Sequence, residues 1–202
     1  MNPSLATLAV VVGAYLLGSV SFAVVASRLY GLPDPHSYGS GNPGATNVLR
    51  TGNKSAAAFT LAGDGIKGWL AVWIAAELGA SWSDASLTTA GAALAVFLGH
   101  LFPIFHRFAG GKGVATAAGV CFALSWPLGA AVLVIWLGMV LAFRMASLAS
   151  LAAAFAAPAV GLYFIGNRPE AWVLFPIAGL LIWRHRENIR KLLAGTERKI
   201  GS

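Results

Sequence analysis

Residues 113–143 read GVATAAGVCFALSWPLGAAVLVIWLGMVLAF, an apolar run that decides how many helices this chain forms. A helix that crosses a bilayer needs about 20 apolar residues, and the usual upper limit is about 25. This run is longer than that limit, and it contains Pro127. Proline removes a helix hydrogen bond and clashes with the preceding turn. The run is therefore either one kinked helix or two short helices that meet near Trp126 and Pro127.

Composition places the whole chain in a membrane. Of its 202 residues, 57% are hydrophobic and 10% are charged, and the mean hydropathy is +0.73. Soluble domains carry about 25% charged residues. The single cysteine, Cys121, excludes a disulfide within the chain. The first apolar run lacks a basic start and is too long for a signal peptide, so we expect a retained helix. The remaining apolar runs are 4–27, 55–79, 86–105, 147–165 and 171–183.

The placement of positive charge chooses between the two alternatives. The chain has fourteen Lys and Arg and seven Asp and Glu, which gives a net charge of +7. The basic side chains gather in residues 31–54, in residues 106–112, at Arg144 and in the tail 184–202. Cytoplasmic loops are enriched in Lys and Arg, and two helices within 113–143 put all four segments on one side. We expect an all-α integral membrane protein of about seven transmembrane helices, some crossing only partly, that forms one domain over 1–202. Its N-terminus is expected outside and its C-terminus in the cytoplasm.

The polar stretch YGSGNPGATNVLR, residues 38–50, contrasts with the apolar runs around it. It fits G-x-G-x-x-G, but a dinucleotide site needs a βαβ unit that a helical membrane protein lacks. Bare glycine backbone still lets N–H groups converge on an anion, and Arg50 offers a planar fork suited to phosphate. The alternative is an ordinary cytoplasmic turn. The predicted phosphate-binding residues are Gly39, Ser40, Gly41, Asn42, Gly44, Thr46, Asn47 and Arg50.

A second glycine-rich stretch, AGGKGVAT, covers residues 109–116. It departs from the Walker A spacing, because Gly113 follows the lysine where the motif has Ser or Thr. Gly110, Gly111 and Gly113 nevertheless flank Lys112 at the expected start of a helix. A helix N-terminus with bare backbone and a lysine is suited to bind an anion. The alternative is that Lys112 only marks the cytoplasmic side.

Other polar residues lie close to or inside the expected helices. Asp64 and Lys67 are three residues apart, so they can pair on one face, and a structural and a direct role stay equally open. His185 and Asn188 have the same spacing after the last helix. We expect His100 to be a packed structural residue. The inner side carries no carboxylate cluster suited to Mg²⁺, and no histidine is followed by Asp five residues later.

The sequence resembles the PlsY family of bacterial acyl-phosphate:glycerol-3-phosphate acyltransferases. The resemblance rests on GSGNPGATNVLR, DGIKG, GHLFPIF, GGKGVAT and RHRENIRKL, which occur in this order over nearly the whole chain. It implies transfer of a fatty acyl group from acyl phosphate to glycerol 3-phosphate in the bacterial inner membrane, as part of phospholipid synthesis. The implied products are lysophosphatidic acid and phosphate. The site would face the cytoplasm, the partners would be the two substrates and membrane lipid, and neither cofactor nor nucleic acid is expected.

The resemblance gives the candidate residues roles. Lys112, Arg50, Ser40 and His185 are the expected catalytic residues. Lys67, Ser147 and Asn188 join the glycine-rich residues in substrate binding, although RMASLAS matches the family only loosely around Ser147. Because acyl phosphate is already activated, positioning and electrostatics can supply most of the acceleration. Either His185 or the substrate's own phosphate can act as the base.

Two other classes of function compete with an enzyme. A transporter of phosphorylated anions would also need basic and glycine-rich groups, but its site would lie near the midplane, often between internal repeats. Here no repeat is visible, and the donors gather at one interface. A membrane scaffold would explain the basic tail but not GSGNPGATN.

Overall fold

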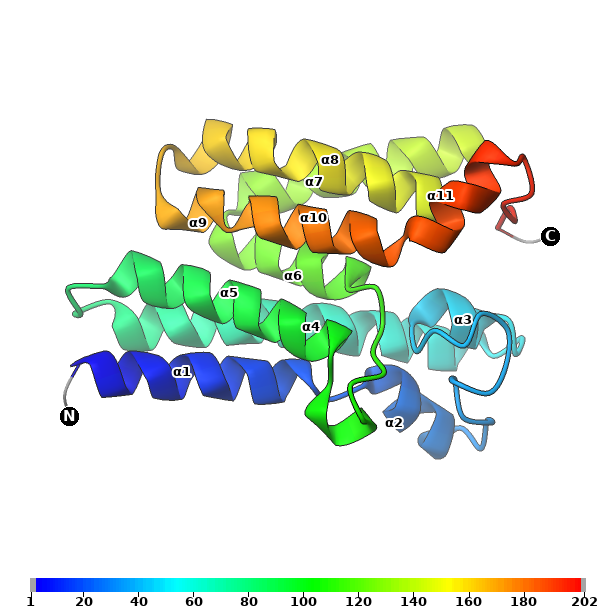
Figure 1. The fold of residues 1–202 in the computed structure, drawn as a ribbon, viewed down its shortest axis with the longest axis horizontal. Helices are drawn as coiled ribbons and strands as arrows, with labels where there is room; N and C mark the ends of the chain where they lie inside the picture. Colours follow the sequence, from blue (N-terminus) through cyan, green and yellow to red (C-terminus); the bar gives the residue numbers. More distant parts are fainter. Residues whose placement is uncertain (1–2, 201–202) are drawn as a thin grey trace.

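The computed structural model describes residues 3–200, and every regular element in that part of the chain is a helix (Figure 1). The all-helical prediction is therefore confirmed for these residues. The elements are α1 Pro3–Gly18, α2 Phe22–Leu29, α3 Ala45–Leu49, α4 Lys54–Gly79, α5 Ala85–Leu101, a 3₁₀ turn Ile104–His106, α6 Val114–Leu124, α7 Trp126–Phe143, α8 Ala146–Ile165, α9 Pro169–Trp172, α10 Leu174–Arg184 and α11 Arg186–Leu193.

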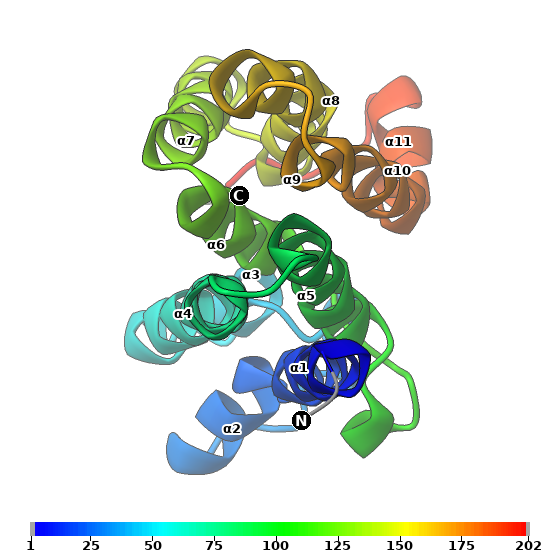
Figure 2. The same ribbon diagram turned by 90° about the vertical axis from the view of Figure 1, so that its left-hand side faces the viewer.

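The long helices lie roughly parallel to one axis and form two groups around α6. Viewed end-on, α1, α4 and α5 lie on one side of α6, and α7, α8 and α10 lie on the other (Figure 2). One apolar core joins α1, α4, α5, α6 and α10, and a second joins α6, α7, α8 and α10. Helix α6 therefore contributes to both cores, through Val120 and Cys121 in its second half.

The run 113–143 forms two helices, as charge placement predicted. Helix α6 ends at Leu124 and α7 begins at Trp126, while Ser125 between them has an extended backbone with φ −164° and ψ 124°. Pro127 lies in the first turn of α7. Proline is tolerated at the start of a helix because the first N–H groups have no partner within the helix. The proline therefore separates two helices here and does not kink one.

The first apolar run differs from the single helix that we expected. It breaks at residues 19–21 into α1 and α2, which are bent by 42°. The Ser21 hydroxyl caps α2 by accepting a hydrogen bond from the Val24 N–H at 3.4 Å. At the end of α1, Gly18 lies so close to the backbone of Val96 in α5 that a Cβ would clash there. Close packing of α1 on α5 and the cap on α2 together explain the break.

Glycines also bring α4 and α6 together. A Cβ at Gly68 would clash with the Thr116 carbonyl, and a Cβ at Gly119 would clash with the Gly65 carbonyl. The two backbones touch because Gly68 and Gly119 have no side chain. This contact fixes the start of α6 beside the middle of α4.

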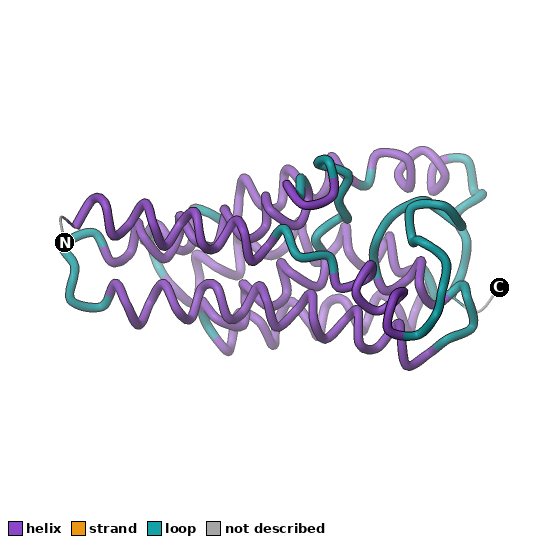
Figure 3. The backbone as a smooth tube through the Cα atoms, turned by 90° about the horizontal axis from the view of Figure 1, so that it is seen from below, coloured by secondary structure: helices purple, strands orange, loops and turns teal. Residues whose placement is uncertain are grey.

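The polar segments gather at one end of the bundle. The segment 31–54, α11 and the tail lie at that end, and the α4–α5 and α8–α9 connections lie at the other (Figures 1 and 3). The loop 102–113 lies between the middle of the bundle and the polar end (Figure 1). In the described part of the chain, three helical segments are long and apolar enough to cross a membrane, namely Ala85–His106, Trp126–Phe143 and Ala146–Ile165. The bent pair α1 and α2 would make a fourth. Seven spans and the direction of the termini stay predictions.

Labelling can test the predicted orientation. In a variant that replaces Cys121 by alanine, a cysteine introduced at Arg198 should react with a membrane-impermeant thiol reagent only after the membrane is opened. A second cysteine introduced at Asp84, at the opposite end of the bundle, should react in intact cells. The physical reason is the excess of Lys and Arg at the polar end. Labelling of position 198 in intact cells would contradict the orientation.

Candidate active site

The first glycine loop is built around the buried side chain of Asn47. Its Oδ1 accepts hydrogen bonds from the N–H of Ser40 at 2.9 Å and from the Ser40 hydroxyl at 3.2 Å. Its Nδ2 donates to the carbonyls of Pro35 at 2.9 Å and Tyr38 at 3.2 Å. These four bonds occupy both ends of the amide. Asn47 therefore shapes the loop from inside, and it lies behind the surface that a ligand would meet.

Arg50 lies across the bare backbone of Gly39. Gly39 has a φ of +60°, and a Cβ there would clash with Asn47 and stand 3.1 Å from Arg50 Nη1. Gly41 has a φ of +64°. Residues other than glycine rarely adopt such angles. The loop thus presents the exposed side chains of Ser40 and Arg50 next to uncovered backbone. Thr46 is also exposed, and Asn42 is half-buried beside Gly44.

The second glycine loop, residues 109–113, is tied to different elements at successive positions. Arg184 Nε donates to the Gly111 carbonyl at 3.0 Å, and its Nη2 donates to the Gly110 carbonyl. The Gly111 N–H donates to the His100 carbonyl at 3.1 Å. Gly113 has a φ of +84°, and a Cβ there would clash with the Phe97 ring. With these carbonyls engaged, the loop leads directly into the N-terminus of α6.

The fold brings the two glycine loops into contact. A Cβ placed on Gly111 would stand 3.1 Å from the Pro43 carbonyl oxygen, which belongs to the first loop. Arg50 also acts electrostatically on Lys112, since its positive charge is among the causes that lower the pKa of Lys112. Arg50 and Lys112, which are far apart in the chain, therefore lie on two loops that meet in the fold.

A network of hydrogen bonds holds the side chain of Lys112 in place. Its ammonium donates to Asn188 Oδ1, and the Asn188 amide donates to Glu197 Oε1 at 2.8 Å. The same Glu197 oxygen accepts a hydrogen bond from the Ser147 hydroxyl at 2.6 Å. This network joins the second glycine loop to α11, to the tail and to the start of α8. Burial lowers the pKa of Lys112 to about 8, while the negative charge of Glu197 partly offsets that effect.

His185 lies buried between α10 and α11, with 2% of its surface exposed. Its Nδ1 is 2.8 Å from the Leu181 carbonyl, so Nδ1 is the nitrogen that carries a proton in the neutral ring. Nε2 then keeps its lone pair and can accept a hydrogen bond. Burial lowers the pKa of His185 to about 4, and the positive charge of Lys112 contributes to the shift. The imidazole is thus neutral at physiological pH.

Asp64, Lys67 and His100 form a buried cluster behind the loops. Lys67 Nζ is 2.8 Å from Asp64 Oδ1 and donates to the Val20 carbonyl at 2.6 Å. His100 Nδ1 is 3.6 Å from the same Asp64 oxygen. The His100 ring lies against Gly111, because a Cβ at Gly111 would clash with its Nε2. This arrangement favours the alternative in which Lys67 orients other groups, and His100 packs as a structural residue.

Comparison with known proteins identifies the family. A model of the family described as Glycerol-3-phosphate acyltransferase matches residues 8–195. The chain belongs to the glycerol-3-phosphate acyltransferase family. The resemblance that the glycine-rich motifs indicated is therefore confirmed.

Relatives in this acyltransferase family match the chain over most of its length. The glycerol-3-phosphate acyltransferase of Cupriavidus taiwanensis is 60% identical over 98% of both chains. That of Burkholderia thailandensis is 57% identical over 94% of both chains. The fold is similar to crystal structures of PlsY (YgiH), an integral membrane glycerol 3-phosphate acyltransferase. Its glycerol 3-phosphate form gives a TM-score of 0.89 at 40% identity, covering 97% of this chain and 96% of that chain. Its lysophosphatidic acid form gives a TM-score of 0.87.

The acyltransferase fold gathers most of the residues that the sequence nominated. The contacts above connect both glycine loops with Lys112, Asn188 and Ser147. His185 lies close enough to Lys112 for its positive charge to lower the pKa of the imidazole. Sequence reasoning missed Arg184 and Glu197, which looked like ordinary charges of the basic tail. The usable signal for Glu197 was its negative charge within a positive segment.

Proposed function

We propose that this protein transfers a fatty acyl group from acyl phosphate to the C1 hydroxyl of glycerol 3-phosphate, giving lysophosphatidic acid and phosphate. The main support for this proposal is that two glycine loops, distant in sequence, meet beside Arg50 and Lys112. Both proposed substrates carry a phosphate, so an enzyme that joins them needs more than one anion-binding group. The family membership supports glycerol 3-phosphate as the acceptor.

The proposed phosphate site combines backbone and side-chain donors. Helix α6 begins at Val114, directly after the second glycine loop. The first N–H groups of a helix have no partner inside it and lie at its positive end. Lys112 adds a full charge at this point, and Arg50 adds a guanidinium that can hold a phosphate with two parallel bonds. Ser40, on uncovered backbone, adds a neutral donor.

The proposed reaction needs no nucleophile from the protein. The C1 hydroxyl oxygen attacks the acyl carbonyl carbon, a tetrahedral intermediate forms, and the bond from that carbon to the phosphate oxygen breaks. Lys112 and Arg50 stabilise the negative charge that gathers on the leaving phosphate. His185 Nε2 orients the hydroxyl by accepting its hydrogen bond. Because the pKa of His185 is lowered to about 4, His185 is a weak final acceptor, and the released phosphate takes the hydroxyl proton.

The acyl chain is proposed to lie among the helices. An apolar groove of about 330 Å³ lies where α4, α6 and the start of α7 meet, and it is lined by Trp69, Gly119, Phe122 and Trp126. It lies further along α6 than Lys112, so a chain attached at the phosphate site would run along α6 into the apolar part of the bundle. This geometry suits one domain in the bacterial inner membrane with its site on the cytoplasmic face.

The decisive experiment incubates the purified protein with palmitoyl phosphate and glycerol 3-phosphate and measures lysophosphatidic acid by mass spectrometry. Product should form in the presence of EDTA, because the proposed site uses Lys112, Arg50 and backbone groups to neutralise the phosphates. Palmitoyl-CoA should be a poor donor, because no site for a nucleotide was found in the sequence. Efficient use of palmitoyl-CoA, or restoration by Mg²⁺ of an activity abolished by EDTA, would contradict the proposal.

A further inference from the structure

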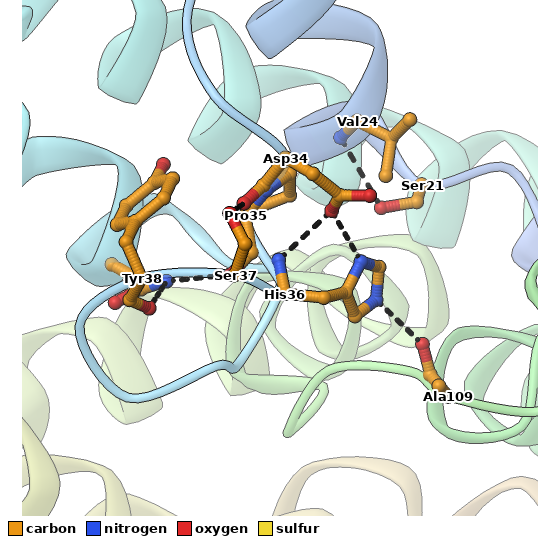
Figure 4. Close-up of polar contacts among 9 residues, drawn as sticks. Ser21, Val24, Asp34, Pro35, His36, Ser37, Tyr38 and Ala109 are labelled. Carbon is orange, nitrogen blue, oxygen red and sulfur yellow. Dashed lines mark hydrogen bonds and ion pairs between the residues drawn. The ribbon is translucent and has the colours of Figure 1, made fainter.

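Three successive carbonyls of the second glycine loop meet partners from outside the loop. The Ala109 carbonyl oxygen lies 3.0 Å from Nε2 of His36, which belongs to the segment before the first glycine loop (Figure 4). The next two carbonyls, those of Gly110 and Gly111, accept hydrogen bonds from Arg184. Other parts of the chain therefore hold this row of carbonyl oxygens in place.

Arg184 ends α10 and applies one edge of its guanidinium to the loop. Its Nε donates to the Gly111 carbonyl at 3.0 Å, and Nη2, on the same edge, donates to the Gly110 carbonyl. One arginine can hold two acceptors in this way because its guanidinium is planar and rigid. The two bonds fix the planes of two successive peptide units. They also engage the edge of Arg184 that could otherwise bind a phosphate.

The loop needs this support because its own residues fix its backbone poorly. A Cβ at Gly110 would clash with the carbonyls of His100 and Leu101, and a Cβ at Gly111 would clash with the His100 ring. Packing against the end of α5 therefore requires glycine at both positions. Glycine has the greatest conformational freedom of all residues, so these peptide units can rotate unless a partner outside the loop holds them.

The direction of the Gly111 carbonyl determines where the Lys112 N–H points. Every peptide bond in residues 3–200 is trans, and in a planar trans peptide the C=O and the N–H point in opposite directions. Because the Gly111 carbonyl faces Arg184, the Lys112 N–H points away from Arg184. In the part of the chain that the structure describes, this N–H donates to no acceptor. It is therefore available to a ligand.

The apolar groove indicates which phosphate this N–H would meet. The groove lies beside Gly119 and Phe122, whereas Lys112 precedes the first turn of α6. An acyl chain in the groove places its phosphate group toward the start of α6, beside the Lys112 N–H. Glycerol 3-phosphate has no acyl chain that would direct its phosphate to this point.

We propose that Arg184 is a positioning residue, which holds the peptide units of Gly110 and Gly111 so that the Lys112 N–H faces the phosphate of the acyl-phosphate donor. The inference rests on the proposed function, because it concerns the donor of the proposed reaction. Without Arg184, the peptide unit between Gly111 and Lys112 turns over and presents its carbonyl oxygen to the phosphate. The competent loop is then one of several conformations, and the apparent affinity for the donor falls with its population.

The kinetic test compares the two substrates in Arg184→Met, which keeps a long side chain without donors. If the competent population falls to about a tenth, KM for palmitoyl phosphate rises about tenfold. The kcat should change by less than about threefold, because saturating donor selects the competent loop, and KM for glycerol 3-phosphate should change by less than about twofold. Arg184→Lys keeps the charge but loses the rigid edge that holds two carbonyls, so its KM for palmitoyl phosphate should also be raised.

Arg186→Met is the matched control. It removes the same charge from a residue that also neighbours His185. The Arg186 guanidinium lies 4.8 Å from the centroid of the Trp183 ring and donates to the Trp183 carbonyl at 3.5 Å, so it is engaged within its own segment. Its KM for palmitoyl phosphate should stay within about twofold of wild type.

Three kinetic results would overturn the inference. The first is a wild-type KM for palmitoyl phosphate in Arg184→Met, and the second is an equal rise in Arg186→Met. The third is full recovery in Arg184→Lys, which would assign the effect to charge alone. Should Arg184→Met fail to fold, Arg184→Lys decides by itself, because its KM for palmitoyl phosphate must still exceed that of wild type while KM for glycerol 3-phosphate does not.

NMR tests the same peptide unit without turnover. The dipeptide Gly-Lys occurs once in the sequence, at Gly111 and Lys112. Glycine labelled with ¹³C at the carbonyl, together with ¹⁵N-lysine, therefore gives a single signal, which comes from the unit that Arg184 is proposed to hold. In wild type the signal should move when palmitoyl phosphate is added without glycerol 3-phosphate. It should shift or split in Arg184→Met and stay in place in Arg186→Met.

This signal separates the inference from the proposed function. A signal that is unchanged in Arg184→Met, or that does not respond to palmitoyl phosphate in an active enzyme, would refute the positioning role alone. A signal that changes in Arg184→Met, in a protein whose wild type fails to transfer palmitate, would support the hold of Arg184 on the loop and count against the proposed function.

Discussion

Lys112→Ala is expected to lower kcat/KM for glycerol 3-phosphate by at least the roughly 10- to 150-fold that the loss of one charge-assisted hydrogen bond causes. A hydrogen bond to a charged group contributes about 1.5–3 kcal/mol, and each 1.36 kcal/mol is a factor of about ten in rate. Lys112 stands at the start of α6 and is held by Asn188. Its loss removes a charge from the phosphate site and a partner from the supporting network. Steady-state kinetics in lipid, with folding checked by thermal stability, measures the effect.

The charge of Lys112 also sets an upper pH limit on activity. Burial lowers its pKa to about 8, and kcat/KM reports the ionisation of the free enzyme. The ammonium form is present below this pKa and is lost above it, so kcat/KM should fall as pH rises through about 8. Arginine stays charged throughout this range. Lys112→Arg should therefore lose the alkaline fall, whatever its maximal rate, and an unchanged fall would assign the limit to another group.

Arg50→Ala is expected to lower kcat/KM by about 10- to 150-fold, the loss of one charge-assisted hydrogen bond to phosphate. The guanidinium lies over Gly39 beside Ser40, where its planar fork can bind two oxygens at once. Arg50→Lys keeps the charge but loses that fork, so it should be impaired as well. The same kinetic assay in lipid, compared at one pH, measures both variants.

Arg198→Ala is the matched control for both substitutions. Arg198 is an exposed cation in the tail, outside the proposed phosphate site, and its loss should change kcat/KM by less than about twofold because surface charges contribute little. Near wild-type rates for both Arg50→Ala and Lys112→Ala would remove the phosphate cradle from the mechanism. The glycine stretches would then be turns.

Local sequence was enough to predict the helical class and the main break. Apolar length and Pro127 separated α6 from α7, because proline is disfavoured in a helix interior and tolerated in its first turn. The break between α1 and α2 was missed, since Ser19–Ser21 interrupt the apolar run only weakly. It depends on the close approach of Gly18 to Val96 in α5, which no local pattern records.

By itself, the sequence determined which chemical groups are available: a chain apolar enough for a membrane, two glycine-rich stretches, and the cations Arg50 and Lys112. Residue type fixes these properties before any folding. Only the tertiary structure decided which groups face the site, because that depends on contacts between distant segments. In the folded chain, the Asn47 side chain points inward and supports its own loop, and Lys67 pairs with Asp64. Glu197 of the tail supports Lys112 through a hydrogen bond with Asn188. A buried polar group must find a partner wherever the fold offers one, and the position of that partner is set by packing between helices.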